Sequence, residues 1–256
     1  MNKLLLLITI ILLVACSPSP KAVQTAIAGT QAVWTPVTTQ TAYPTYTPQP
    51  TMMITEVVTV TITPTSAPPV FSDVPSANWE RTWIETLYRN GVTTGCSTEP
   101  LDYCPDQPVT RAQMAAFLER ALHGSMYTPP AGTMAVFADV PLSNWAVDWI
   151  TQLYADGITT GCLASPLSYC PDRPVTRAQA AILLLRARHG ASYAPPDVGL
   201  GTGFGDVSIG YWAAAWIKQL SAESITSGCG DGNYCPDDPL TRAQVAKFLV
   251  LTFNLP

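Results

Sequence analysis

Apolar side chains recur at helical spacing in two stretches between residues 78 and 123. In the first stretch, one helical face would carry Trp79, Trp83, Ile84 and Leu87. In the second, which begins after Thr110, the apolar face would carry Met114, Phe117, Leu118, Ala121 and Leu122. Asn78 is a suitable N-terminal cap for the first helix, and Gly91 lies where a left-handed residue commonly ends one. The pattern predicts a helix, a loop and a second helix.

This pattern occurs three times in the chain. A Phe-x-Asp-Val motif starts at Phe71, Phe137 and Phe204, and a Thr-Arg-Ala-Gln motif starts at Thr110, Thr176 and Thr241. Successive copies are offset by 66 residues and then by 67, which falls to 65 after a two-residue deletion between Cys229 and Cys235. One hairpin of this size buries too little apolar surface to be stable, so we expect the copies to share a core. The predicted repeats span residues 70–123, 136–189 and 203–256.

Residues 1–16 have the pattern of a bacterial export signal. Lys3 precedes an apolar run over residues 4–14, which is shorter than the roughly 20 residues that span a bilayer. The run ends in Leu-Val-Ala-Cys, which resembles the lipobox of bacterial lipoproteins. The resemblance implies removal of a signal peptide, residues 1–15, and acylation of Cys16, which would hold the mature protein on a membrane. The alternative is an ordinary secretory signal or an uncleaved anchor, with Cys16 incidental.

Residues 16–69 have the composition of a linker. They contain 14 Thr and 9 Pro, and their only charged side chains are those of Lys21 and Glu56. Such a segment cannot bury enough apolar surface to offset the entropy lost on ordering, so we predict a disordered Thr/Pro-rich linker. The alternative is local order in two pieces, a weak helix over residues 22–34 and a short strand over residues 54–63, where Val and Ile alternate with Thr.

Composition and charge exclude several functions. The net charge is −5, and residues 70–256 hold 11 basic and 17 acidic side chains, which argues against nucleic acid as a partner. There are only two histidines, His123 and His189, each expected at a helix C-terminus. The sequence has no nucleophile elbow, phosphate loop or metalloprotease motif. We therefore predict that the protein is not an enzyme and needs no cofactor and no metal.

Six of the seven cysteines form one pair in each copy. An exported protein can keep disulfides, and the repeat predicts the pairs Cys96/Cys104, Cys162/Cys170 and Cys229/Cys235. Their spacing and the shortage of histidine argue against structural zinc at these cysteines. Each predicted disulfide would hold the loop that precedes the second helix of its copy.

The three copies resemble the S-layer homology (SLH) domain over residues 70–253. The resemblance rests on Phe-x-Asp-Val, the aromatic first helix, the Gly-containing turn and Thr-Arg-Ala-Gln, although Gln stands where Glu is commonest and most relatives lack the cysteine pair. It implies an all-α fold, with three helix-loop-helix repeats in a pseudo-threefold bundle and grooves between neighbouring repeats. It also implies binding of cell-wall polysaccharide, either a secondary wall polymer, commonly pyruvylated, or peptidoglycan-linked material.

Three sets of residues are candidates for glycan binding. By the resemblance, an arginine of each copy would face the ligand. An arginine at a helix N-terminus can donate paired hydrogen bonds to a carboxylate of the ligand. The three sets are Arg111, Arg177 and Arg242; Gln113, Gln179 and Gln244; and Trp79, Trp145 and Trp212. Each has a structural alternative, because Thr-x-x-Gln also forms a capping box and tryptophans also build cores.

The sequence thus predicts a non-catalytic anchoring protein of the bacterial cell envelope. Lipid at Cys16 would attach it to a membrane, and the repeats would bind cell-wall polysaccharide outside the cytoplasm. The alternative is a scaffold that binds partner proteins or an S-layer-associated structural protein. An exposed apolar patch of tryptophans away from the arginines would favour that alternative.

Overall fold

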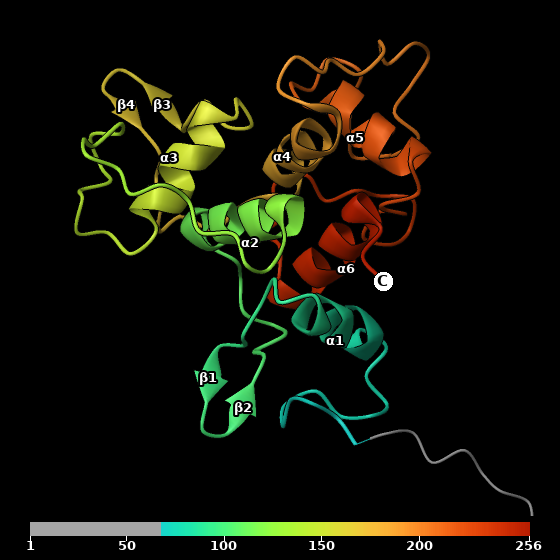
Figure 1. Cartoon of the computed structure of the whole chain (residues 1–256). Coiled ribbons are helices and arrows are strands. Elements are labelled where there is room, and N and C mark those ends of the chain that lie inside the picture. Colours follow the sequence, from blue (N-terminus) through green and yellow to red (C-terminus); the bar gives the residue numbers. More distant parts are fainter. Residues whose placement is uncertain (1–67) are drawn as a thin grey trace, which may run out of the picture. The chain divides into compact units, whose positions relative to one another are not determined.

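The computed structural model describes residues 68–256 (Figure 1). The predicted signal peptide, Cys16 and nearly all of the predicted linker lie outside the described residues. The described part is rich in helix and contains two small antiparallel sheets. Its elements are α1 (Arg81–Arg89), β1 (Ser97–Thr98), β2 (Leu101–Asp102), α2 (Arg111–His123), α3 (Val147–Ala155), β3 (Leu163–Ala164), β4 (Leu167–Ser168), α4 (Arg177–His189), α5 (Ala214–Ala222) and α6 (Arg242–Phe253).

The two small sheets were missed by the all-α prediction. They are hairpins in which Ser97 pairs with Asp102 and Leu163 pairs with Ser168. Each lies inside a disulfide-closed loop, and closure brings the two arms of the loop within hydrogen-bonding distance. The corresponding loop near Cys229 is two residues shorter, and there the pairing is reduced to one bridge between Gly230 and Asn233.

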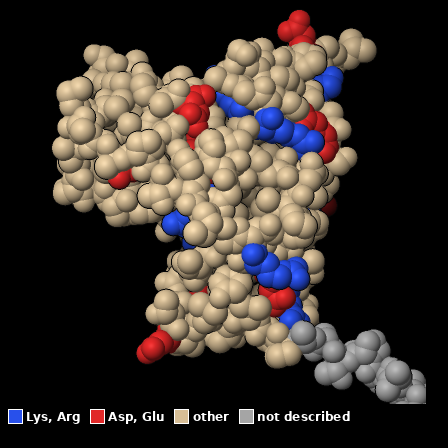
Figure 2. Space-filling model, in the orientation of Figure 1, with Lys and Arg blue, Asp and Glu red and all other residues tan. Residues whose placement is uncertain are grey.

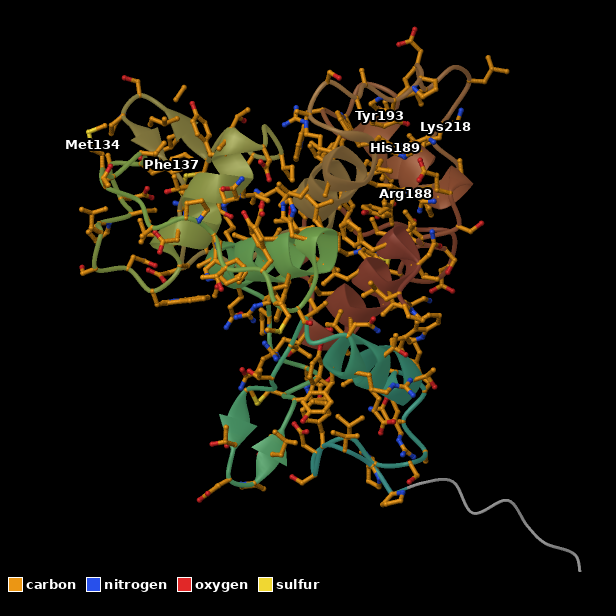
Figure 3. The ribbon with its side chains drawn as sticks, in the orientation of Figure 1. Met134, Phe137, Arg188, His189, Tyr193 and Lys218 are labelled. Carbon is orange, nitrogen blue, oxygen red and sulfur yellow. A yellow bond between two sulfur atoms is a disulfide. The ribbon has the colours of Figure 1, made fainter. Side chains whose placement is uncertain are left out.

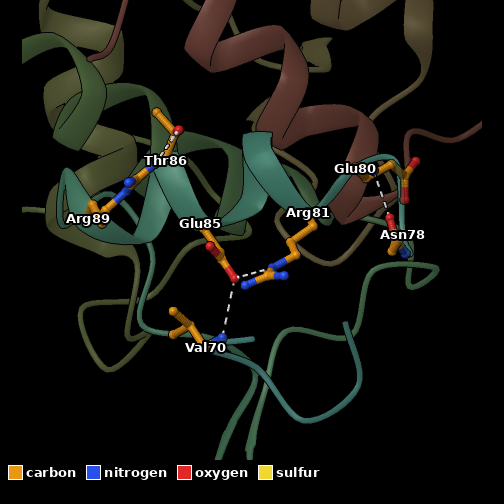
Figure 4. Close-up of polar contacts among 7 residues, drawn as sticks. All are labelled: Val70, Asn78, Glu80, Arg81, Glu85, Thr86 and Arg89. Atoms are coloured by element: carbon orange, nitrogen blue, oxygen red, sulfur yellow. Dashed lines mark hydrogen bonds and ion pairs between the residues drawn. The ribbon is translucent and has the colours of Figure 1, made fainter. Parts of the chain in front are cut away.

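The first helix of the first copy begins later than its apolar pattern predicts. α1 starts at Arg81, so Trp79 lies before the helix and is 66% exposed. The prediction that Asn78 caps this helix is wrong, because the N-cap of α1 is Glu80 and no side chain caps it. Asn78 Oδ1 instead accepts a hydrogen bond of 2.7 Å from the backbone N–H of Glu80 in the turn before the helix (Figure 4). Along the helix, Arg81 pairs with Glu85 at 2.6 Å. Trp83 is only half-buried against the core.

The ends of the first helices follow the prediction. Gly91 and Gly157 adopt left-handed conformations with φ of 68° and 70°. Ser224 occupies the same place after α5 with φ of 59°, a conformation that a residue with a Cβ adopts at a cost.

The helices of different copies pack against one another. α2, α4 and α6 are in mutual contact, while α3 packs on α2, α5 packs on α4 and α1 packs on α6 (Figure 1). Each first helix therefore lies on the second helix of another copy, and the contact of α1 with α6 joins the two ends of the described chain. Three backbone hydrogen bonds also link the residues just before α2, α4 and α6 in a ring. The N–H of Val109 donates to the carbonyl oxygen of Leu240, that of Leu240 to Val175, and that of Val175 to Val109.

The core lies between these helices and beneath the loops. Its largest fully buried side chains include Phe71, Phe137, Tyr103, Tyr169 and Tyr234. Three disulfides, Cys96–Cys104, Cys162–Cys170 and Cys229–Cys235, hold the loops as the repeat predicts. Within residues 68–256, no helix has both the length and the hydropathy that a membrane crossing requires.

Candidate functional site

Capping boxes fix the start of each second helix. The hydroxyls of Thr110, Thr176 and Thr241 accept hydrogen bonds from the backbone N–H groups of Gln113, Gln179 and Gln244. The three glutamine side chains in turn accept from the threonine N–H groups. The side-chain oxygen of each predicted glycan-binding glutamine therefore already accepts a hydrogen bond from the protein backbone. Any contact of these glutamines with glycan remains a prediction.

The three predicted arginines are buried, with 5% or less of each residue exposed. Arg111 Nε donates to the carbonyl oxygen of Tyr169 at 2.7 Å, and the Tyr169 hydroxyl donates to the carbonyl oxygen of Arg111 at 2.9 Å. The Arg111 guanidinium also lies 4.6 Å from the centre of the Tyr169 ring. Burial lowers the pKa of Arg111 and raises the pKa of Tyr169, because removal from water disfavours the charged form of each group.

The same reciprocal pair occurs in the other copies. Arg177 pairs with Tyr234 through bonds of 2.6 and 2.8 Å, and Arg242 pairs with Tyr103 through bonds of 2.7 and 2.8 Å. The arginines therefore join neighbouring copies. This role was missed by sequence reasoning, although Tyr recurs before the second cysteine of every copy. A ligand could use only the terminal amino groups that the tyrosines leave, and glycan contact by these arginines remains a prediction.

A cavity of about 630 Å³ brings together one predicted residue of each kind, and we call it the main cavity. It is lined by Arg111, Gln179 and Trp212, which come from three different copies. Arg111 Nη1 lies 3.5 Å from Gln179 Oε1, and Trp212 is 59% exposed. The remaining predicted arginines, glutamines and tryptophans do not line this cavity.

Two further arginines line the main cavity, and sequence reasoning missed both. Arg173 is exposed and immediately precedes Pro174. The first and third copies carry Gln107 and Asp238 at this position. An arginine in only one copy was the sequence signal that could have identified Arg173 as a candidate. Arg186 lies with its guanidinium 5.4 Å from the centre of the Trp216 ring, and its buried Nε has no hydrogen-bond partner within residues 68–256.

The main cavity is cationic in a protein that is acidic. Its three arginines face a single carboxylate in the lining, that of Asp237, and this carboxylate accepts a hydrogen bond of 2.8 Å from the Tyr211 hydroxyl. Most of the face in Figure 2 is uncharged, with a few groups of basic and acidic side chains. The arrangement can hold an anion by paired N–H donors while an aromatic face lies beside it.

Two of the three predicted tryptophans lie near cationic groups, whereas Trp145, which is 62% exposed, lines neither the main cavity nor the smaller one beside Lys247. Trp79 lies 5.6 Å from the Lys247 ammonium, measured to the ring centre. Lys247 also lines a second cavity, of about 470 Å³, together with Thr226 and Ser227. Trp212 borders the main cavity with Arg111. These two tryptophans therefore combine an aromatic face with a nearby positive charge.

Comparison with known proteins identifies the C-terminal copy. Residues 203–246 match the family model of the S-layer homology domain. The chain therefore contains an S-layer homology domain.

Three relatives extend the likeness along the chain. An endoglucanase of Bacillus sp. (strain KSM-635) is 30% identical over 186 residues, which cover 70% of this chain and 18% of the relative. An S-layer protein of Bacillus licheniformis is 27% identical over 142 residues, covering 56% of this chain and 15% of the relative. A cell surface protein of Thermoanaerobacter kivui is 31% identical over 118 residues, covering 46% of this chain and 15% of the relative.

The chain covers less than a fifth of the length of each of these relatives. The S-layer homology domain, with the S-layer and cell surface relatives, supports a role in anchoring at the cell envelope, outside the cytoplasm. The similarity to an endoglucanase is confined to a small part of that enzyme.

Proposed function

We propose that this protein is a non-catalytic anchor that joins a membrane to cell-wall polysaccharide. Three S-layer homology repeats, over residues 70–123, 136–189 and 203–256, form a pseudo-threefold bundle. Cys16 carries the lipid, and the Thr/Pro-rich segment up to residue 69 separates the lipid from the bundle. The family match to residues 203–246 and the cyclic packing of the helices support the repeat bundle, and the sequence pattern of residues 1–69 supports the anchor and the spacer.

The main cavity is the observation on which the glycan proposal rests. It joins Arg111, Gln179 and Trp212 from three copies, and it adds Arg173 and Arg186. A buried donor without a partner, such as Arg186 Nε, costs free energy unless a ligand or water accepts its hydrogen bond. A wall polymer that bears carboxylates, such as a pyruvylated polysaccharide, supplies acceptors for the arginines and a sugar ring for Trp212.

The alternative function is a scaffold for partner proteins or for the S-layer. An apolar patch of tryptophans away from the arginines would favour it. Trp212 instead borders a cavity with three arginines, and Trp79 lies beside Lys247. The mixture of aromatic and cationic groups favours an anionic glycan over an apolar protein surface.

Co-sedimentation with purified wall sacculi tests the proposal. The full chain is assayed with sacculi before and after removal of the secondary polymer. The informative variants are Trp212→Ala and Arg173→Gln, which places at Arg173 the residue that the first copy carries as Gln107. Arg89→Gln is the matched control, because Arg89 is also exposed and its loss changes the charge equally.

Binding that disappears with the polymer, and that weakens in both cavity variants but not in the control, is the expected result. Equal binding by all variants would mean that the main cavity is not the site at which the protein binds the polymer. Failure of the unaltered protein to sediment with either kind of sacculus would overturn glycan binding and favour the scaffold.

A further inference from the structure

One core position differs in kind between the three copies. Leu185 of α4 and Val250 of α6 are buried aliphatic residues, whereas the matching residue of α2 is Glu119, which has no exposed surface. Neither carboxylate oxygen of Glu119 accepts a hydrogen bond from any residue in the range 68–256. A carboxyl group buried without such bonds is costly, and the copies show that the fold does not require it there.

The Glu119 carboxyl group is directed at a histidine and a second carboxylate. His123 lies one turn further along α2, and its Nε2 is 3.3 Å from Glu119 Oε2. The same Nε2 is 3.4 Å from Oδ2 of Asp156, the residue that caps the C-terminus of α3. One ligand atom from each of the three side chains lies within 4.8 Å of the other two.

The two separations from His123 Nε2 match the edges of a tetrahedral metal site. With metal–ligand bonds of about 2.0–2.2 Å, neighbouring ligand atoms of a tetrahedron lie about 3.3–3.6 Å apart. The measured separations of 3.3 and 3.4 Å fall in this range. We propose that Glu119, His123 and Asp156 bind a first-row divalent cation, with zinc as the best match to one imidazole and two carboxylates, and that the ion joins α2 to α3.

Neighbouring groups orient two of the ligands. Gln152 Nε2 donates to Asp156 Oδ1 at 2.8 Å, which leaves Oδ2 directed at His123. The Tyr127 ring lies 4.3 Å from the His123 ring, centre to centre, and packs in turn against Trp149. Such outer groups set the orientation of metal ligands and strengthen the binding of the ion.

The site has a path to solvent. The side chains of His123 and Asp156 are 35% and 27% exposed, so the ion can enter between them and a water molecule can complete four-coordination. Glu119 closes the inner side. Binding releases protons, because burial and the nearby Asp156 charge raise the pKa of Glu119 to about 8.

The second copy is a control that lacks one ligand. His189 Nε2 lies 2.8 Å from Glu223 Oε1. Tyr193 stacks on His189, both labelled in Figure 3, at the same distance between ring centres, 4.3 Å, as Tyr127 from His123. Leu185 occupies the place of Glu119, and Arg188 Nε lies 3.3 Å from Glu223 Oε2. A cation beside the carboxylate and an aliphatic group in the third position leave no site for a metal ion there.

Zinc titration of the full chain tests the site. Cys16→Ala is present in every sample, since it removes the thiol outside the three disulfides. Chelator-treated protein is titrated calorimetrically with zinc chloride, and the bound metal is quantified after gel filtration. We expect one zinc per chain and a higher melting temperature with zinc. Co²⁺ should give the visible absorption of a four-coordinate nitrogen and oxygen site.

Three variants locate the ion. Glu119→Leu introduces the residue of the second copy, so the fold should be retained while zinc affinity falls by a factor of ten or more, on the order of 1.4 kcal/mol. His123→Ala should abolish binding, and His189→Ala should leave it unchanged. Absence of zinc binding by the unaltered chain, or equal binding by Glu119→Leu, would overturn the proposal. Equal losses in the two histidine variants would overturn it as well.

Discussion

Arg242 and Tyr103 hold the last copy of the repeat to the first. The arginine Nε donates to the tyrosine carbonyl at 2.7 Å, and the tyrosine hydroxyl donates to the arginine carbonyl at 2.8 Å, across 139 residues of sequence. Arg111 with Tyr169 and Arg177 with Tyr234 make the other two links. The three pairs form a ring, so that each copy is held by both of its neighbours.

Removal of the Tyr103 hydroxyl should destabilise the whole described domain. Tyr103→Phe removes a buried hydrogen bond to the carbonyl oxygen of Arg242, which should lower the free energy of unfolding by about 0.5–1.5 kcal/mol. Urea denaturation followed by both tryptophan fluorescence and circular dichroism measures the loss. Because the ring couples the copies, both probes should report a single transition. Two separate transitions would show that the copies unfold independently.

Tyr88→Phe is the control for this substitution. The same hydroxyl is removed from a partly buried tyrosine that packs on the core near Phe71. Its effect should be smaller than that of Tyr103→Phe. An equal loss in both variants would assign the effect to the hydroxyl in general and not to the link between copies.

Ser224 is a position at which the protein can be stabilised. Its left-handed conformation favours glycine, which the other copies have as Gly91 and Gly157. Ser224→Gly should therefore raise the free energy of unfolding by up to about 1 kcal/mol. Thermal denaturation measures the gain. The reverse change, Gly157→Ser, should destabilise by more, since its Cβ would lie 2.5 Å from that of Ala191. A lower melting temperature for Ser224→Gly would contradict this account.

Local features of the fold could be predicted from the sequence. The capping box of Thr110 with Gln113, the left-handed Gly91 and the helix end at His123 each depend on a few neighbouring residues. Tertiary features could not be predicted in the same way. The hairpins depend on closure of the disulfide loops, and the start of α1 at Arg81 depends on a turn that leaves Trp79 outside the helix.

The candidate site could be predicted only in part. Trp212, Gln179 and Arg111 were predicted one by one, but a sequence does not show that residues so far apart line one cavity. Burial of Arg111 against Tyr169 was missed because a Thr-Arg-Ala-Gln motif does not indicate which way its arginine points. Glu119 was missed because its partner Asp156 comes from the next copy.

Salt should weaken the binding of an anionic wall polymer at the main cavity. Three arginines line this cavity, and exposed charges such as that of Arg173 are screened over about 8–10 Å at 0.10–0.15 M salt. Binding isotherms of full-length protein with fragments of the secondary polymer, at several salt concentrations, measure the dependence. Arg173→Gln should bind more weakly at low salt and show a shallower dependence. Binding that does not change with salt would indicate recognition through Trp212 and neutral hydrogen bonds.

The metal-free protein should lose stability as the pH rises. The pKa of Glu119 is raised from 4.5 in the unfolded chain to about 8 in the fold. Between these values the native state binds more protons than the unfolded state, so the free energy of unfolding falls with rising pH, by a few kcal/mol at most. The titratable groups that interact with Glu119 are His123, Asp156, Tyr127 and Tyr169.

Chelator-treated protein is therefore denatured with urea at intervals from pH 5 to pH 9, beside Glu119→Leu. The difference in unfolding free energy between the variant and the unaltered protein should grow as the pH rises, because only the unaltered protein must lose a buried proton. His189→Ala, which leaves this cluster intact, should keep the pH dependence of the unaltered protein. Saturating zinc should reverse the loss above pH 8, since the ion takes the place of the proton on Glu119. Parallel pH profiles for the unaltered protein and Glu119→Leu would mean that Glu119 is ionised in the fold throughout this range.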